Sequence, residues 1–196
     1  RWGEIDKLPV FPEVEKPIYN PRKAIDYGAQ MEALGRIPLP YRAIIEFLME
    51  TGLRPGEACV LKLSDLDARM RTMTVRRTLS AGQVRETTKG RSNIVIPLSD
   101  RAWEIVRNAA GDTIGDQWVF MNPVTRKHYS TEFLRKMWRN HSGIEADLYS
   151  ATRHSFCTQL VEAGVSEIEA QGLMRHKDQN SSYDGEDIRK VYVPFS

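Results

Sequence analysis

The stretch Thr51-Gly52-Leu53-Arg54-Pro55-Gly56-Glu57 places an arginine in a glycine turn between two helical patterns. Apolar side chains recur at helical spacing over residues 41–50, and Gly52 suits the left-handed position that ends a helix. The helical pattern resumes after the turn, so we expect Arg54 near the N-terminus of a second helix. Glu57 would orient it. An arginine held in this way suits a phosphate group, although a surface ion pair with Glu57 is the simpler alternative.

A second arginine, Arg153, lies within a long helical pattern over residues 149–164. The apolar positions of this pattern, Phe156, Leu160 and Val161, fall on one face and are expected to point into a core. Arg153 therefore belongs to a helix that packs against the rest of the chain.

A further helix is predicted directly after this one. Gly164 ends the first helix, and Ser166 with Glu169 forms the capping box that begins the next, which runs to Met174. Helix, glycine turn and helix also fit a helix-turn-helix DNA reader. That alternative leaves Arg54 unexplained.

Three strand patterns follow the first arginine, over residues 72–79, 83–88 and 93–98. Gly82 and Gly90 mark the turns between them. The remaining apolar periodicity is helical, as in the capped pattern that begins at Ser99. The sequence therefore predicts an α+β fold that is mostly α-helical, with a small three-stranded antiparallel sheet.

Together, these segments resemble the catalytic domain of the tyrosine recombinases, the phage-integrase family. In that family a T-G-L-R-x-x-E box is followed by H-x-x-R-H, then by G-H, and finally by a nucleophilic tyrosine. Residues 86–98 resemble the family's β-hairpin, in which Lys89 takes the place of the turn lysine. The resemblance covers nearly the whole chain, and its three boxes occur in the family's order.

The resemblance implies a role for each matching residue. Arg54 and Arg153 would stabilise the charge on a phosphate under attack, since each guanidinium presents a planar fork of donors. Lys89 would act as general acid to the leaving 5′ hydroxyl. His176 would donate a hydrogen bond to the phosphate, and Glu57 would orient Arg54. The reaction needs neither a metal nor a cofactor.

Two positions of the phosphate-binding boxes depart from the family pattern. Ser150 stands where the family usually has the first histidine of H-x-x-R. A hydroxyl can bond a phosphate oxygen, but it is a poor base near neutral pH. The family's G-H reads Arg175-His176 here, which adds a cation.

The nucleophile is the largest departure. The family commonly places its tyrosine nine residues after the box histidine, and Gly185 occupies that position. Tyr192 lies later, in a segment that resembles the family's run after the tyrosine, and we expect it to be the nucleophile. Tyr183, two residues before Gly185, is the alternative. The simpler alternative for both Tyr192 and Tyr183 is a surface tyrosine in a C-terminal tail.

Composition adds the expected partner. The chain has 196 residues, 41% of them hydrophobic, and a formal net charge of +2. Basic residues crowd the strand region, and a local basic stripe can bind DNA even when the net charge is small. The candidate DNA-binding residues are Arg76, Arg77, Arg85, Arg91 and Arg175. The two cysteines have no metal-ligand spacing, and no apolar run is long enough to span a membrane.

The same resemblance suggests how the chain is organised. Residues 1–20 would be an entry linker, residues 21–180 the catalytic domain, and residues 181–196 a C-terminal segment with the nucleophile. The family's N-terminal core-binding domain would be absent from this chain. We expect a bacterial or phage-encoded protein of the cytoplasm, associated with the nucleoid.

The expected function is site-specific recombination in the integration or excision of a phage or mobile element, through a 3′-phosphotyrosyl intermediate. Double-stranded DNA and further copies of the protein would be its partners, as a tetramer on paired sites. Two alternatives stay open: a non-catalytic DNA-binding module on the same scaffold, and a related strand-passage enzyme such as a type IB topoisomerase or telomere resolvase.

Overall fold

The computed structural model describes residues 24–86, 94–111 and 115–174. Its helical elements are α1 (Tyr27–Arg36), η1 (Leu39–Tyr41), α2 (Arg42–Thr51), α3 (Pro55–Ala58), η2 (Leu63–Asp65), α4 (Asp100–Ala110), α5 (Thr131–His141), η3 (Ser150–His154), α6 (Ser155–Glu162) and α7 (Glu167–Leu173). Its strands are β1 (Leu66–Asp67), β2 (Thr72–Val75), β3 (Arg77–Ser80), β4 (Gln83–Glu86) and β5 (Ile94–Pro97). This mostly helical fold with small antiparallel sheets confirms the predicted α+β class.

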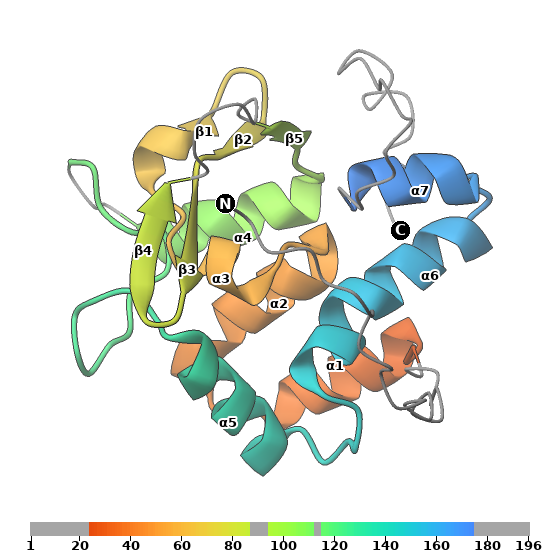
Figure 1. The fold of residues 1–196 in the computed structure, drawn as a ribbon. Coiled ribbons are helices and arrows are strands. Elements are labelled where there is room, and N and C mark those ends of the chain that lie inside the picture. Colours follow the sequence, from red (N-terminus) through yellow and green to blue (C-terminus); the bar gives the residue numbers. More distant parts are fainter. Residues whose placement is uncertain (1–23, 87–93, 112–114, 175–196) are drawn as a thin grey trace, which may run out of the picture.

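Helix α2 forms the centre of the core. Its apolar side chains point to several sides, and most of them are buried, including Ile44, Ile45, Phe47 and Leu48. Helices α1, α3, α4 and α6 and the segment η3 all pack against it. Figure 1 shows α2 and α3 in the middle of the molecule, with the strands on one side and α6 and α7 on the other. The turn after α2 is therefore at the meeting point of these parts.

The strands form two sheets, which differs from the predicted single one. The first sheet has the order β1-β2-β5, and the second consists of β3 and β4; all pairs are antiparallel. The expected strand over residues 72–79 is interrupted at Arg76, so its two halves pair with different partners. At this break, Arg76 and Arg77 both contact the buried carboxylate of Asp65, which holds the chain between the two sheets.

The predicted helix over residues 149–164 also has two parts. It begins with the π-helical segment η3 and continues as α6, after which Gly164 adopts a positive φ of 93°. Phe156 and Leu160 are buried as predicted. The prediction for Val161 was wrong, because it is 38% exposed on the outer face of α6. The Ser166–Glu169 capping box at the start of α7 is confirmed.

Candidate active site

Arg54 lies at the N-cap of α3, immediately after the glycine turn. Its side chain is 48% exposed, and its Nη1 lies 3.5 Å from Oε1 of Glu57. The Glu57 carboxylate is almost fully buried and also accepts the backbone N–H of Arg54 at 3.0 Å. The same carboxylate thus fixes both the backbone and the guanidinium of Arg54. The arginine is tethered at its base while part of its side chain faces solvent.

Glycine at position 52 suits the turn for two reasons. Gly52 has a backbone φ of +59°, which residues other than glycine rarely adopt. A β-carbon there would also lie 2.5 Å from Cδ1 of Phe156 and 3.0 Å from Sδ of Met174. The turn before Arg54 therefore packs directly against α6 and the residue that follows α7.

Arg153 extends from η3 into this contact. Its side chain is 1% exposed, and Nη1 donates a hydrogen bond of 2.6 Å to the carbonyl of Gly52. Nη2 donates to the carbonyl of Met174. Arg153 thus joins segments more than a hundred residues apart in the sequence. The structure brings the second predicted arginine next to the turn that holds the first.

Ser150 and Arg153 both lie on η3, where the backbone hydrogen bond spans five residues instead of the four of an α-helix. The N–H of Ser155 bonds the carbonyl of Ser150, five residues back, as a π-helix requires. Ser150 is buried, and its own N–H donates to Oδ1 of Asp147 at 2.8 Å. π-helical turns are rare and often occur at functional sites, because they shift the side chains that follow them.

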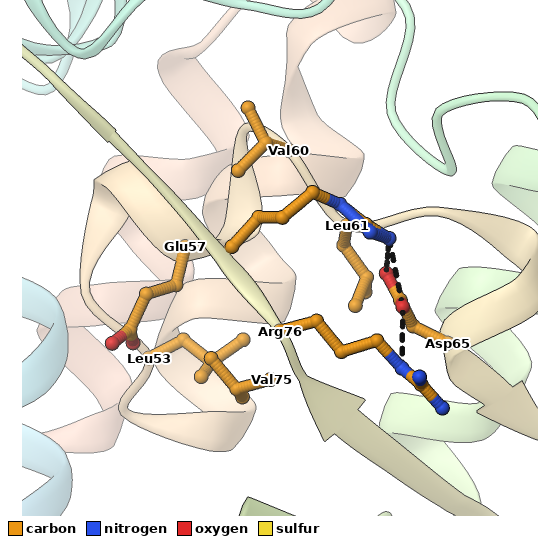
Figure 2. Close-up of a pocket in the computed structure, with 8 residues that line it drawn as sticks. Leu53, Glu57, Val60, Leu61, Asp65, Val75 and Arg76 are labelled. Carbon is orange, nitrogen blue, oxygen red and sulfur yellow. Dashed lines mark hydrogen bonds and ion pairs between the residues drawn. The ribbon is translucent and has the colours of Figure 1, made fainter. Parts of the chain in front are cut away.

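A buried carboxylate that the sequence analysis missed holds two of the predicted DNA-binding arginines. Asp65 is 4% exposed, and both its oxygens accept from Nη2 of Arg77, at 2.8 and 2.7 Å. Nε of Arg76 lies 3.3 Å from Oδ1 of Asp65. Figure 2 shows Asp65 and Arg76 joined on one side of a pocket and Glu57 on the other. Asp65 thereby anchors the break between β2 and β3.

The two arginines differ in what they leave accessible. The Arg77 side chain is 13% exposed and the Arg76 side chain 49% exposed. Arg85, on β4, is exposed and forms no ion pair with another residue in the described parts of the chain. Arg76 and Arg85 thus offer charge to a partner, whereas Arg77 mainly joins β3 to Asp65. Asp65 also accepts the backbone N–H of Lys62, three residues back, at 2.9 Å.

Several predicted site residues lie outside the described parts of the chain. They are Lys89, Arg91, Arg175, His176, Tyr183 and Tyr192. Connectivity alone shows that Lys89 lies between β4 and β5, and that His176 comes two residues after Met174. The assignments for these residues stay predictions, as do the domain boundaries near positions 20 and 180.

Cys59, the C-cap of α3, is the nearest thiol in sequence to the arginine turn. It is fully buried, and this desolvation raises the pKa of its thiol to about 12. A thiol with that pKa is protonated at neutral pH and is a poor nucleophile. Within residues 24–86, 94–111 and 115–174, no group of three or more His, Cys, Asp and Glu residues could hold a metal ion.

The two guanidiniums of the predicted site differ in what they can bind in this structure. One guanidinium is fixed at its base and half exposed, and the other is buried against the same turn. Guanidinium groups stay charged at any working pH and bind phosphate through paired hydrogen bonds.

Among the described helices, none is long and apolar enough to cross a bilayer.

Comparison with known proteins identifies a matching family and several relatives. Residues 26–183 match the model of the phage integrase family. A relative, the tyrosine recombinase XerC of Actinobacillus pleuropneumoniae serotype 7, is 27% identical over 191 residues, which cover 88% of this chain and 58% of XerC. The chain spans about half the length of the curated relatives it matches.

Solved structures share the fold. The integrase of transposon Tn1549, in complex with a circular intermediate DNA, superposes with a TM-score of 0.66 at 18% identity, over 89% of this chain and 66% of that one. A lambda integrase dimer bound to a COC′ core site gives a TM-score of 0.60 at 19% identity, over 85% of this chain and 62% of that one.

Proposed function

The chain belongs to the phage integrase family, and we propose from this premise that it is the catalytic part of a site-specific DNA recombinase. The observation that carries the proposal is the 2.6 Å hydrogen bond from Arg153 to the carbonyl of Gly52. It joins the two arginine boxes at the turn that holds Arg54. The reaction is cleavage and rejoining of DNA strands in the integration or excision of a phage or mobile element.

The proposed chemistry is an exchange of one phosphodiester for another. The phenol oxygen of Tyr192, or of Tyr183, attacks the scissile phosphorus and forms a 3′-phosphotyrosyl bond, while the bond to the 5′ oxygen breaks. The phenol loses its proton to a general base, for which His176 is the candidate, and Lys89 gives the departing 5′ oxygen its proton. Rejoining reverses these steps with a 5′ hydroxyl from the other duplex, so the reaction consumes no external energy source.

The described residues stabilise the charge that develops on the phosphate. Arg54 and Arg153 would donate to its non-bridging oxygens, with Glu57 fixing Arg54. Ser150 would supply a hydroxyl where the family usually has a histidine, and His176 a further donor. Because Arg153 is 1% exposed, we expect DNA binding to part Met174 from the Gly52 turn before Arg153 meets the phosphate.

The proposed partner is duplex DNA, and its binding would be mainly electrostatic. The exposed guanidiniums of Arg76 and Arg85 lie in the strand region, with Arg91 and Arg175 completing the basic set proposed from the sequence. Exchange of two strands needs more than one active site, so we expect the protein to assemble on paired sites as a tetramer. With DNA as its substrate, we expect the protein to act in the cytoplasm, at the nucleoid.

Covalent capture tests the proposal and does not require the target sequence to be known. Sheared DNA from the genome that encodes the protein is incubated with the full-length protein, the protein is denatured, and DNA still attached to it is sequenced. The recovered sequence then supplies a nicked duplex for gel assays. We expect attachment by the wild type and by Glu32→Gln, a surface control on α1.

Substitution of Arg54 or Arg153 by alanine should lower attachment about 100-fold or more, since one such donor contributes about 3 kcal/mol in the transition state. We expect Tyr192→Phe to abolish it. Loss in Tyr183→Phe alone would assign the nucleophile to Tyr183 instead. Binding of the recovered duplex with no attachment in any form of the protein would refute the recombinase proposal and favour the non-catalytic module.

A further inference from the structure

Gln30 is a fully buried polar side chain on α1, far in sequence from both arginine boxes. Its Nε2 donates a hydrogen bond of 2.7 Å to the carbonyl of Ala151, which lies on η3 between Ser150 and Arg153. Its Oε1 accepts a hydrogen bond of 2.9 Å from Nε2 of Gln159 on α6. Both ends of the Gln30 amide thus contact the helix that carries Arg153.

Neighbouring contacts hold the same segment from the same side. Oγ of Ser155 donates to the carbonyl of Ser150 at 2.8 Å and accepts the backbone N–H of Ile25 at 2.9 Å. Nε2 of Gln159 also reaches the carbonyl of Ile25 at 3.4 Å. The start of α1 and the π-helical segment are therefore joined by a continuous set of buried and partly buried hydrogen bonds.

A π-helical turn needs such external support. Its wider ring gives poorer backbone geometry than an α-helix, so a π-helical turn persists where neighbouring groups stabilise it. A buried amide with both of its polar atoms bonded is also costly to disturb, because the partners would be left without hydrogen bonds. Gln30 supports the π-helical turn from outside, and both polar atoms of its buried amide are bonded. Ser150 and Arg153 extend from this same segment.

We propose that Gln30 is a positioning residue for the active site, which sets the π-helical register of η3 and thereby directs Arg153 at the Gly52 turn. This rests on the proposed function insofar as Arg153 acts on a scissile phosphate. Gln30 itself touches no reacting atom. It acts through the carbonyl of Ala151, two residues before Arg153.

The test uses Gln30→Met in the full-length protein, because methionine keeps the length of the side chain and removes both hydrogen bonds. Single-turnover cleavage of the nicked duplex should fall on the order of 10- to 100-fold, as expected when a catalytic group is displaced by about 1 Å. DNA binding should stay within about twofold, since the Gln30 side chain is fully buried and does not itself contact DNA. Glu32→Gln, on the exposed side of the same helix, should change neither quantity.

A substrate with a methylphosphonate at the scissile position separates positioning from general damage. This group lacks one charged oxygen, so its cleavage depends less on guanidinium donors. Most of the defect of Gln30→Met should therefore disappear on it, as should that of Arg153→Ala. An equal defect on both substrates would overturn the proposal, because it would show a loss unrelated to phosphate charge.

Hydrogen–deuterium exchange gives a readout that does not depend on cleavage. The amides of residues 150–156 should exchange roughly five- to tenfold faster in Gln30→Met. They should exchange faster to a smaller extent in Gln159→Leu, which removes the bonds to Gln30 and to the carbonyl of Ile25 but keeps the bond from Gln30 to Ala151. Unchanged exchange in both variants would refute the role of Gln30, whether or not the wild type cleaves DNA. Faster exchange with no covalent attachment by the wild type would instead refute the proposed function alone. If Gln30→Met does not fold, Gln159→Leu carries the same measurements.

Discussion

Replacing Gly52 by alanine should separate two effects that meet in the turn before Arg54. The first is conformational, because Gly52 has φ +59°, where a β-carbon costs about 1–2 kcal/mol. The second is steric, because that β-carbon would lie 2.5 Å from Cδ1 of Phe156 and 3.0 Å from Sδ of Met174. Overpacking of this kind costs about 1–3 kcal/mol. We therefore expect Gly52→Ala to lower the free energy of unfolding by about 2–5 kcal/mol.

Gly82→Ala is the matched control. Gly82 has φ +75° in the turn between β3 and β4, and a β-carbon there meets no atom within 4 Å. Only the conformational part applies, so the expected loss is about 1–2 kcal/mol. Urea unfolding followed by circular dichroism gives both values. Equal losses for the two variants would refute the close packing of the Gly52 turn against Phe156 and Met174.

Three further predictions concern charge and burial. Asp65→Asn should cost about 3–5 kcal/mol of unfolding free energy, because it leaves the mostly buried guanidinium of Arg77 without its counter-ion. Arg76→Ala, which removes a half-exposed partner of Asp65, should cost less than about 1 kcal/mol. Equal losses in urea titrations of the two variants would contradict this. Iodoacetamide at pH 8 should modify Cys157 well before Cys59, because burial raises the pKa of the Cys59 thiol to about 12. Mass spectrometry that shows the reverse order would contradict the burial of Cys59. Burial, and secondarily the carboxylate of Glu46, raise the pKa of Glu50 in the folded protein. The protonated Glu50 therefore contributes to stability below its unfolded pKa, and this contribution is lost as the pH rises through the folded pKa. Unfolding free energies from pH 4 to 7 should therefore fall less steeply in Glu50→Gln, and an unchanged slope would count against this.

Much of the local structure around the arginines could be predicted because it depends on neighbouring residues. Gly52 ends α2 in the left-handed conformation, and Ser166 with Glu169 begins α7, as the sequence pattern indicated. Both are decided by contacts within a few residues. The same holds for the position of Arg54 at the N-cap of α3, beside Glu57.

The features that were missed depend on contacts between distant segments. At the break between β2 and β3, Arg77 bonds Asp65, twelve residues away, and a strand pattern does not reveal this contact. The π-helical start of the helix that carries Arg153 is held by Gln30 on α1, 121 residues from Ala151. Val161, by contrast, was misplaced for a local reason: it lies five residues after Phe156, about 140° around α6, so the face that buries Phe156 leaves Val161 partly exposed.

The proximity of the two arginine boxes could be expected only from the family resemblance. Nothing in the spacing of Arg54 and Arg153 requires them to meet. In the structure, the carbonyl of Gly52 accepts a hydrogen bond from Arg153, and the Phe156 ring covers the same turn. This contact gives the resemblance a physical basis at the residues where the proposed chemistry takes place.

The central claim, that this fold cleaves DNA through a tyrosine, is tested most directly by identifying the residue that becomes attached to DNA. The full-length protein is trapped on the nicked duplex recovered by covalent capture, digested with trypsin and nuclease, and analysed by mass spectrometry. We expect a single modified peptide with the nucleotide phosphate on Tyr192, or on Tyr183 if that residue is the nucleophile. Attachment at any other residue, or none on a duplex that the protein binds, would contradict it.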